Sequence, residues 1–109
     1  MLKLAGPKVS LDFDDTFNTF RGKKLALELL GQGYDVYIVT RRHDTDRQFV
    51  ERTVKAAGIN IPSNHIYFTN GALKWKTLQR LGIKRHYDNS QNEIDAIKAN
   101  TPEIKGIKF

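Results

Sequence analysis

The chain has 109 residues, of which 39% are hydrophobic, 28% charged and 10% aromatic. This length suits one domain with an ordinary core, and the composition is globular rather than disordered. The 18 Lys and Arg against 12 Asp and Glu give a formal net charge of +6, which favours anionic partners such as phosphates or nucleic acid. The absence of cysteine excludes disulfides, thiolate metal sites and a cysteine nucleophile.

The chain carries no sign of a membrane segment. No apolar run approaches the roughly 18 residues needed to cross a bilayer, and the N-terminal stretch 1–15 meets charged residues too early for a signal peptide. We therefore expect a cytoplasmic protein with no membrane contact. Because no repeat, low-complexity tract or linker interrupts the sequence, we expect a single domain over residues 1–109.

Hydrophobic periodicity and turn residues predict strands and helices that alternate along the chain. In chain order these are a strand over Lys8–Phe13, a helix from about Arg21 to Gly31, a strand over Tyr34–Thr40, a helix from an N-cap at Asp44 to Gly58, a strand over His65–Thr69, a helix over Ala72–Leu81, a strand over Arg85–Asp88, a helix around Ile94 and Ile97, and a strand over Ile104–Phe109. Such alternation favours an α/β fold in which a parallel sheet carries helices on both faces.

Polar residues stand where several of these strands end. Asp12 and Asp14 close the first strand, Thr40 closes the second, and Asp88 closes the fourth. Lys74 lies at the start of the third helix. Ligands of parallel sheets bind outside the carboxyl ends of the strands, so we expect these side chains to share one crevice.

Asp12 and Asp14 are two residues apart, so an extended backbone would project both to the same side while Phe13 turns into the core. Two carboxylates held close together suit acid–base chemistry, because their repulsion raises one pKa. They also suit a hard cation such as Mg²⁺. The alternative is an exposed turn after the strand, and Asp15 is interpreted as a turn residue only.

Four motifs in this order resemble those of the haloacid dehalogenase (HAD) superfamily of phosphotransferases. The first is VSLDFDDT over Val9–Thr16, and the second is VYIVT, which ends at Thr40. The third is Lys74, and the fourth is the strand end HYDN, which carries Asp88 and Asn89. Within the superfamily, the sequence is most similar to polynucleotide 3′-phosphatase domains and small phage-type phosphatases.

The resemblance implies a three-layer α/β/α, Rossmann-like core with a five-stranded parallel sheet of order 5-4-1-2-3. It also implies a phosphatase in which Asp12 is the nucleophile and Asp14 the general acid and base. Thr40 would hydrogen-bond a phosphoryl oxygen, and Lys74 would neutralise charge between Asp12 and the phosphate. Mg²⁺ would be held by the Asp12 carboxylate, the Asp14 backbone carbonyl and Asp88.

The spacing of the motifs leaves no room for the cap insertions that give most HAD enzymes their substrate choice. An open site suits a bulky phosphorylated substrate such as a nucleotide or a nucleic-acid end, unless a second copy of the chain covers it. The Thr-x-Arg pattern at Thr40 resembles HAD members that act on nucleic-acid ends, which makes Arg42 a candidate substrate contact. The alternative for Arg42 is a surface arginine before a helix.

Several positions have competing interpretations. Lys76 competes with Lys74 for the role of site lysine. Asn89 stands where many family members have a second Asp. Either Glu93 or Asp95 could compensate through a water, or could simply lie on a solvated helix face or act as a helix cap. The three histidines show no metal-ligand spacing and are interpreted as structural or surface residues: His43, His65 and His86.

Other classes of protein account for the sequence less well. A response-regulator receiver domain also uses Asp, Thr and Lys around Mg²⁺, but its acceptor Asp follows the third strand, where this chain has Thr69 and Asn70. A basic nucleic-acid-binding module would not explain carboxylates at strand ends. A non-catalytic HAD-fold protein with a structural or nucleic-acid-binding role stays open as the alternative to the phosphatase.

Overall fold

The computed structural model describes residues 6–109, so part of the stretch considered for a signal peptide lies outside it. The strands are β1 (Lys8–Leu11), β2 (Asp35–Thr40), β3 (Ile66–Phe68), β4 (Arg85–Asp88) and β5 (Lys105–Lys108). The helices are α1 (Phe20–Gly31), α2 (Arg47–Ala56), α3 (Trp75–Leu81) and α4 (Gln91–Asn100). Three short helical turns join them: η1 (Phe13–Phe17), η2 (Asp44–Asp46) and η3 (Ser63–His65).

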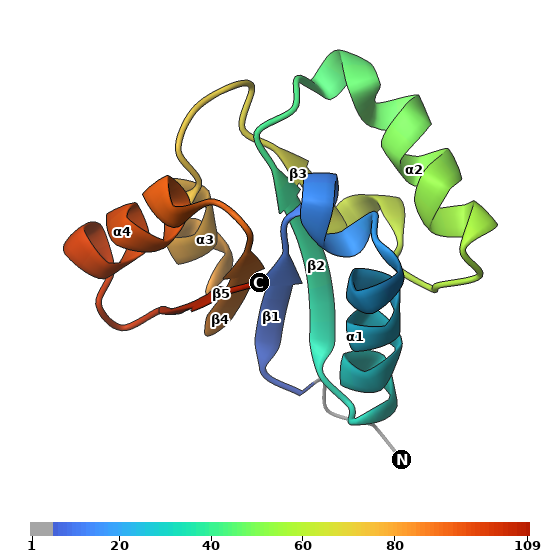
Figure 1. Cartoon of the computed structure of the whole chain (residues 1–109), viewed down its shortest axis with the longest axis horizontal. Coiled ribbons are helices and arrows are strands. Elements are labelled where there is room, and N and C mark those ends of the chain that lie inside the picture. The colour runs from blue at the N-terminus through green and yellow to red at the C-terminus, as the bar shows by residue number, and fades with distance from the viewer. Residues whose placement is uncertain (1–5) are drawn as a thin grey trace.

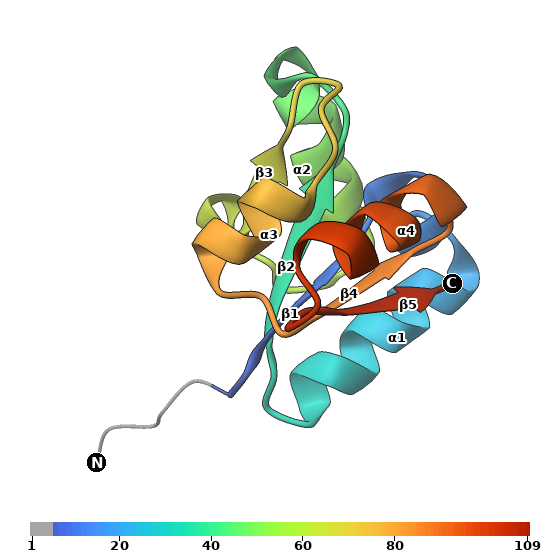
Figure 2. The ribbon, with the colours of Figure 1, turned by 90° about the vertical axis from the view of Figure 1, so that its left-hand side faces the viewer.

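The five strands form one parallel sheet in the order β3-β2-β1-β4-β5. This confirms the expected α/β fold and strand order, read from the opposite edge. Helices α1 and α2 lie on one side of the sheet and α3 and α4 on the other (Figures 1 and 2). The chain leaves β1 in one direction to form β2 and β3 and returns to form β4 and β5 on the other side, so the order reverses between β1 and β4. A crevice at the carboxyl ends of β1 and β4 is where such sheets place their ligands.

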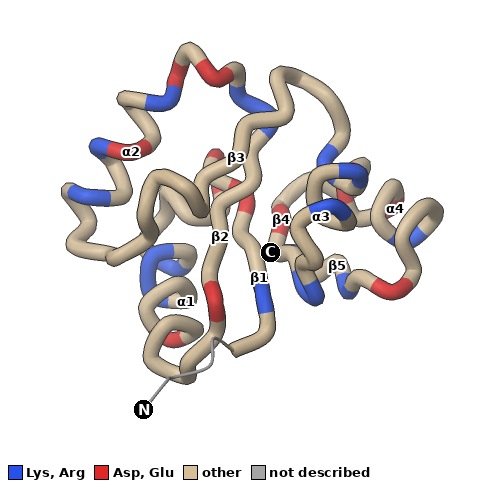
Figure 3. Tube along the Cα trace, turned by 180° about the vertical axis from the view of Figure 1, so that it is seen from behind, with Lys and Arg blue, Asp and Glu red and all other residues tan. Residues whose placement is uncertain are grey.

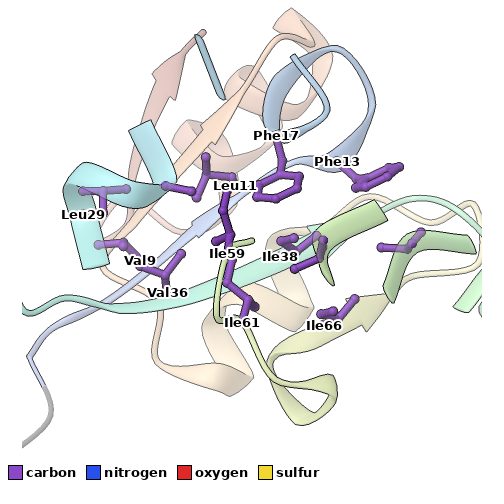
Figure 4. Packing of buried hydrophobic residues seen from close by; sticks show 13 residues of the cluster. Val9, Leu11, Phe13, Phe17, Leu29, Val36, Ile38, Ile59, Ile61 and Ile66 are labelled. Carbon is purple, nitrogen blue, oxygen red and sulfur yellow. The ribbon is translucent and has the colours of Figure 1, made fainter. Parts of the chain in front are cut away.

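Each face of the sheet packs its own apolar cluster. On the α1 and α2 side, Val9 and Leu11 of β1 pack with the rings of Phe13 and Phe17 (Figure 4). The cluster on the α3 and α4 side consists of Tyr37, Val39, Leu78, Ile83, Ile97 and Ile104. These side chains come from β2, the helices and the loops, so the middle of this second face is left to other residues.

Strand alternation fills that middle with polar side chains. In β1, Val9 and Leu11 face α1, so Ser10 faces the α3 and α4 side. Ser10 pairs in register with His86 of β4, and Asp88 lies two residues further along the same face. On this face of the sheet, the strands β1 and β4 that flank the crevice therefore carry polar side chains where an apolar core would be expected.

The first strand is shorter than predicted. It ends at Leu11 rather than Phe13, because η1 follows at once. Within this turn Asp14 has an extended backbone and Asp15 has a φ of 56°, in the left-handed region. Phe13 is fully buried, as expected, and Asp15 is an exposed turn residue.

Two helix starts also differ from the prediction. Asp44 is not the N-cap of α2: it begins η2, its backbone N–H donates to the Asn70 side chain at 2.8 Å, and α2 begins three residues later at Arg47. The third helix begins at Trp75 rather than Ala72, because Ala72 belongs to a turn closed by Thr69. Within residues 6–109 there is no helix with the length and apolar character needed to cross a membrane.

Candidate functional site

Lys74 lies at the centre of a buried cluster of charges. Its Nζ donates to Asp12 Oδ1 at 2.7 Å and to Asp88 Oδ2 at 2.6 Å. The Lys74 side chain is 2% exposed, and the Asp88 side chain is fully buried. A buried ammonium is tolerated only when it is paired, and here one ammonium bridges two carboxylates from different strand ends. The structure thus brings together three of the residues singled out from the sequence.

Hydrogen bonds between the loop after β2 and the loop after β3 position Lys74. The loop after β3 is tied to the end of β2 by the Thr69 N–H, which donates to Thr40 O at 2.9 Å, and by the Gly71 N–H, which donates to Arg41 O at 2.7 Å. The Arg41 guanidinium donates in turn to Gly71 O, at 3.1 Å from Nε and 2.7 Å from Nη2. Lys74 follows this loop at the N-cap position of α3.

Glu93 holds the start of α3 from the neighbouring helix. Its Oε1 accepts the Lys74 backbone N–H at 3.1 Å, and its Oε2 lies 3.7 Å from Arg41 Nε. Glu93 is 1% exposed, and burial raises the pKa of its carboxyl. The interpretation of Glu93 as a solvated helix face is therefore wrong, whereas Asp95 is exposed and pairs with Gln91. Lys76 is exposed, so Lys74 is the lysine that joins the carboxylates.

His86 extends the cluster into the core. Its Nε2 lies 2.8 Å from Asp88 Oδ2, and its Nδ1 lies 2.7 Å from Ser10 Oγ. Burial lowers the pKa of His86, so the ring is neutral and donates through one nitrogen only. The carboxylate of Asp88 can only accept, which assigns the proton to Nε2 and makes Nδ1 the acceptor of the Ser10 hydroxyl. Sequence reasoning missed this contact, although the two-residue spacing of His86 and Asp88 on a strand was a signal for it.

The two bridged carboxylates have opposite pKa shifts. Burial raises the pKa of Asp12 to about 6, and the nearby Lys74 ammonium offsets this only in part. Burial acts on Asp88 in the same sense, but the His86 hydrogen bond and the Lys74 charge outweigh it and lower its pKa to about 2. Asp88 is consequently a permanent anion at neutral pH, while Asp12 exchanges a proton near neutrality.

Asp14 lies outside this cluster. Its carboxylate is 48% exposed and receives two hydrogen bonds from Arg42, at 2.9 Å from Nε and 2.8 Å from Nη2. The Arg42 guanidinium also lies 5.4 Å from the ring centre of Phe13 and 5.0 Å from that of Phe49. Asp12 and Asp14 therefore have different partners: Asp12 pairs with Lys74, whereas Asp14 lies within the turn η1 and pairs with Arg42.

Three further polar residues line the carboxyl edge of the sheet. Thr40 is 1% exposed, and its Oγ1 accepts the Arg42 backbone N–H at 3.2 Å. Thr16, which ends the first motif but was assigned no role from the sequence, is fully buried and donates to Asn89 Oδ1 at 3.5 Å. This contact links the turn after β1 to the end of β4, so Asn89 has a role that needs no metal.

The oxygen atoms at this edge define what cation they could hold. Within residues 6–109 there is no group of three or more His, Cys, Asp or Glu side chains placed as metal ligands. The donors expected from the sequence are the carboxylates of Asp12 and Asp88 and the backbone carbonyl of Asp14, and the Asp88 carboxylate already accepts from Lys74, His86 and Ser90. Mg²⁺ in proteins is commonly held by one or two carboxylates together with waters and substrate phosphates. Two carboxylates are too few for a cation that needs a cage of protein ligands, and the binding of Mg²⁺ at this edge stays a prediction.

Comparisons with known proteins do not add to this geometry. Neither the models of known protein families nor the sequences of characterised proteins match this chain. The structure shows a small α/β domain with a five-stranded parallel sheet, and a fold of this kind hosts many unrelated functions. The function has to be argued from the side chains at the carboxyl edge.

Proposed function

We propose that the protein is a Mg²⁺-dependent phosphatase of the HAD type, which hydrolyses phosphomonoesters through an aspartyl-phosphate. The observation that carries the proposal is the Lys74 ammonium, buried between Asp12 and Asp88 at the end of the central strand. Phosphoryl transfer needs positioned charge more than covalent chemistry. A buried cation beside two carboxylates at a topological switch point supplies such charge and has no evident use as core packing.

In the proposed reaction Asp12 attacks through Oδ2, the oxygen that Lys74 does not contact. A bond forms between this oxygen and phosphorus as the bond from phosphorus to the alcohol oxygen breaks. Water then attacks phosphorus, which releases inorganic phosphate and returns Asp12 to its carboxylate form. Lys74 holds Asp12 in place and balances charge on the transferred group. Bound Mg²⁺ would neutralise phosphoryl charge from the side of Asp12, Asp88 and the Asp14 carbonyl.

Asp14 is the proposed acid for the leaving alcohol and the base for the attacking water. In the structure its carboxylate is tied to Arg42, so it serves in this role only after that ion pair opens or rearranges. A substrate phosphate that attracts Arg42 would free Asp14 in the same step. Thr40, at the end of β2, is the proposed donor to a phosphoryl oxygen.

The lack of an inserted domain over the carboxyl edge of the sheet favours a bulky substrate. The chain between the strands is taken up by single helices, so no inserted domain covers the site. Together with the net charge of +6, this supports a phosphate on a nucleotide or on a nucleic-acid end as the substrate. A second copy of the chain that covers the edge would exclude water better than the monomer does.

The proposal is tested by phosphate release from p-nitrophenyl phosphate and from a 3′-phosphorylated oligonucleotide, with and without Mg²⁺. We expect Mg²⁺-dependent release by the wild type and none by Asp12→Asn. The matched control is Asp15→Asn in the same turn, which changes charge equally at an exposed position whose left-handed backbone Asn tolerates. Equal release by the wild type and Asp12→Asn would contradict the mechanism.

The second candidate is a non-catalytic HAD-fold protein with a structural or nucleic-acid-binding role. The two hydrogen bonds that hold Asp14 on Arg42 favour it, because they occupy the residue that the reaction needs as acid. No release by the folded wild type from either substrate would support this candidate over the phosphatase.

A further inference from the structure

A groove of about 410 Å³ lies between α1 and the strands β4 and β5, apart from the buried charge cluster. Its floor includes Tyr87 and Ile107, which are partners in the parallel register of β4 and β5. Tyr87 packs against the apolar cluster on the α1 side, so this floor is the sheet face opposite to His86 and Asp88. Phe109, two residues beyond Ile107, extends the floor towards the carboxyl edge.

The aromatic side chains of the groove stay partly exposed and lie next to cations. Tyr87 and Phe109 are both only half-buried. The Arg21 guanidinium lies 4.4 Å from the ring centre of Phe109, and that of Arg85 lies 5.8 Å from the ring of Tyr87. Aromatic rings that are accessible on a sheet face and flanked by arginine are the surfaces on which unpaired bases stack.

The rim of the groove is basic. Arg21, Lys24 and Lys108 line it against one acidic residue, Glu28, and all four are exposed. Figure 3 shows the blue bands of Lys and Arg on the first turns of α1. This local excess matches the positive net charge of the chain. An anionic backbone is thus the complement of the rim, whereas a second copy of this basic chain is not.

The groove reaches the edge where the charge cluster lies. The Phe109 N–H donates to the Asp88 carbonyl at 2.8 Å, and the Asp12 N–H donates to the Tyr87 carbonyl at 2.9 Å. Tyr87 and Asp88 are neighbours in β4 whose side chains point to opposite faces. The groove and the charge cluster therefore adjoin the same end of β4, on opposite faces of the sheet.

We propose that this groove binds single-stranded nucleic acid, with bases on Tyr87 and Phe109 and phosphates on Arg21, Lys24 and Lys108. The placing of a terminal phosphate at Asp12 rests on the proposed phosphatase function, whereas the binding of the strand does not. The groove thereby favours a polynucleotide over a small phosphate ester as the substrate of the proposed site at Asp12.

The experiment measures the fluorescence anisotropy of a labelled oligothymidylate without a terminal phosphate, titrated with the full chain at low salt. We expect the double variant Arg21→Glu, Lys108→Glu to weaken binding at least tenfold more than its control and to reduce the salt dependence of the affinity. The control is Lys76→Glu, Lys98→Glu, which changes net charge equally at exposed positions of α3 and α4. Phe109→Ala is expected to weaken binding about tenfold through lost stacking.

Three results would contradict the proposal that the groove binds single-stranded nucleic acid. The first is no binding by the wild type at low salt, and the second is equal weakening of binding by the two double variants. The third is a wild-type dimer in sedimentation that the Arg21→Glu, Lys108→Glu substitutions dissociate and the control substitutions do not. The last would assign the groove to a second copy. Because the probe carries no terminal phosphate to release, the two proposals can fail separately. If strand binding stays intact while neither p-nitrophenyl phosphate nor the 3′-phosphorylated oligonucleotide releases phosphate, the phosphatase proposal is removed and the groove proposal is kept.

Discussion

At the scale of single residues, the site is a continuous chain of buried polar contacts. It runs from Ser10 through His86 and Asp88 to Lys74 and ends at Asp12. His86, Asp88 and Lys74 are each held from at least two sides, so the chain fixes the orientation of Asp88 and Lys74. Asp12 is left with one oxygen that Lys74 does not contact, and this is the atom for which we propose chemistry.

Removing the shared cation should cost stability. Lys74→Met leaves the Asp12 and Asp88 carboxylates buried without their partner, and we expect a loss of about 3 kcal/mol or more in the free energy of unfolding at pH 8. The control Lys76→Met, at an exposed position on the same helix, should stay within about 0.5 kcal/mol of the wild type. Urea denaturation of both variants measures the difference, and equal stabilities would show that the Lys74 bridge contributes nothing.

The raised pKa of Asp12 predicts a pH-dependent gain for Asp12→Asn. The folded state holds the Asp12 proton up to about pH 6, whereas the pKa of an unperturbed aspartate is 3.8, so ionisation of this carboxyl at higher pH destabilises the native wild type. Asn cannot ionise. The free energy of unfolding of Asp12→Asn, relative to that of the wild type, should therefore rise by up to about 3 kcal/mol between pH 4 and pH 7 and then level off. Urea denaturation across this range tests it. A difference that does not change with pH would contradict the shift.

The residues of this site differ in how far the sequence revealed them. Asp12, Lys74 and Asp88 follow from motif order and from the rule that parallel strands end at one edge. The contacts of His86 and Glu93 could not be predicted in this way, because they depend on which strands are neighbours and on how α3 packs against α4. Position along one strand is visible in a sequence, whereas register between strands and the packing of helix ends are not.

At the scale of elements, the contact between α1 and η1 positions the turn that carries Asp14. Gly22 of α1 lies so close to this turn that an added Cβ would stand 1.6 Å from the Thr16 carbonyl oxygen. The Thr19 hydroxyl joins the same two elements, since it donates to Thr16 O at 2.6 Å and accepts the Gly22 N–H at 3.0 Å. The helix and the turn are therefore placed as one unit.

Gly22→Ala should disturb this unit. We expect a loss of about 2 kcal/mol or more in the free energy of unfolding, because backbone cannot yield as a flexible side chain does. Gly31→Ala, in the same helix, meets nothing within 4 Å and should gain up to about 1 kcal/mol from helix propensity. Thermal or urea denaturation of Gly22→Ala and Gly31→Ala measures the difference in stability. Two variants that change stability alike would show that η1 and α1 are not tightly joined.

The structure contains the predicted strands and helices in the predicted order. Some of them begin or end at other residues than predicted, where contacts with distant parts of the chain replace local ones. Strand β1 stops before Phe13 because both Phe13 and Phe17 turn into the α1-side core. Helix α2 starts later than Asp44 because Asn70, far along the chain, takes the Asp44 N–H. Apolar periodicity locates an element, whereas these distant partners decide its last residue.

At the scale of the whole molecule, the topology explains why one sheet carries two kinds of surface. The reversal of strand order between β1 and β4 places the buried carboxylates at the carboxyl edge. The same strand β4 turns Tyr87 to the opposite face, where α1 leaves a basic groove. Alternation along a single strand thus separates the proposed chemistry from the proposed binding of the substrate chain.

Chemical trapping of the phosphorylated protein shows whether Asp12 accepts the phosphoryl group. The protein is mixed with Mg²⁺ and substrate, quenched, treated with borohydride and digested, so that an aspartyl-phosphate is reduced to homoserine and its position is read by peptide mass spectrometry. We expect homoserine at position 12 in the wild type, dependent on substrate and absent from Asp12→Asn. Turnover with homoserine at another position, or with none at all, would contradict it.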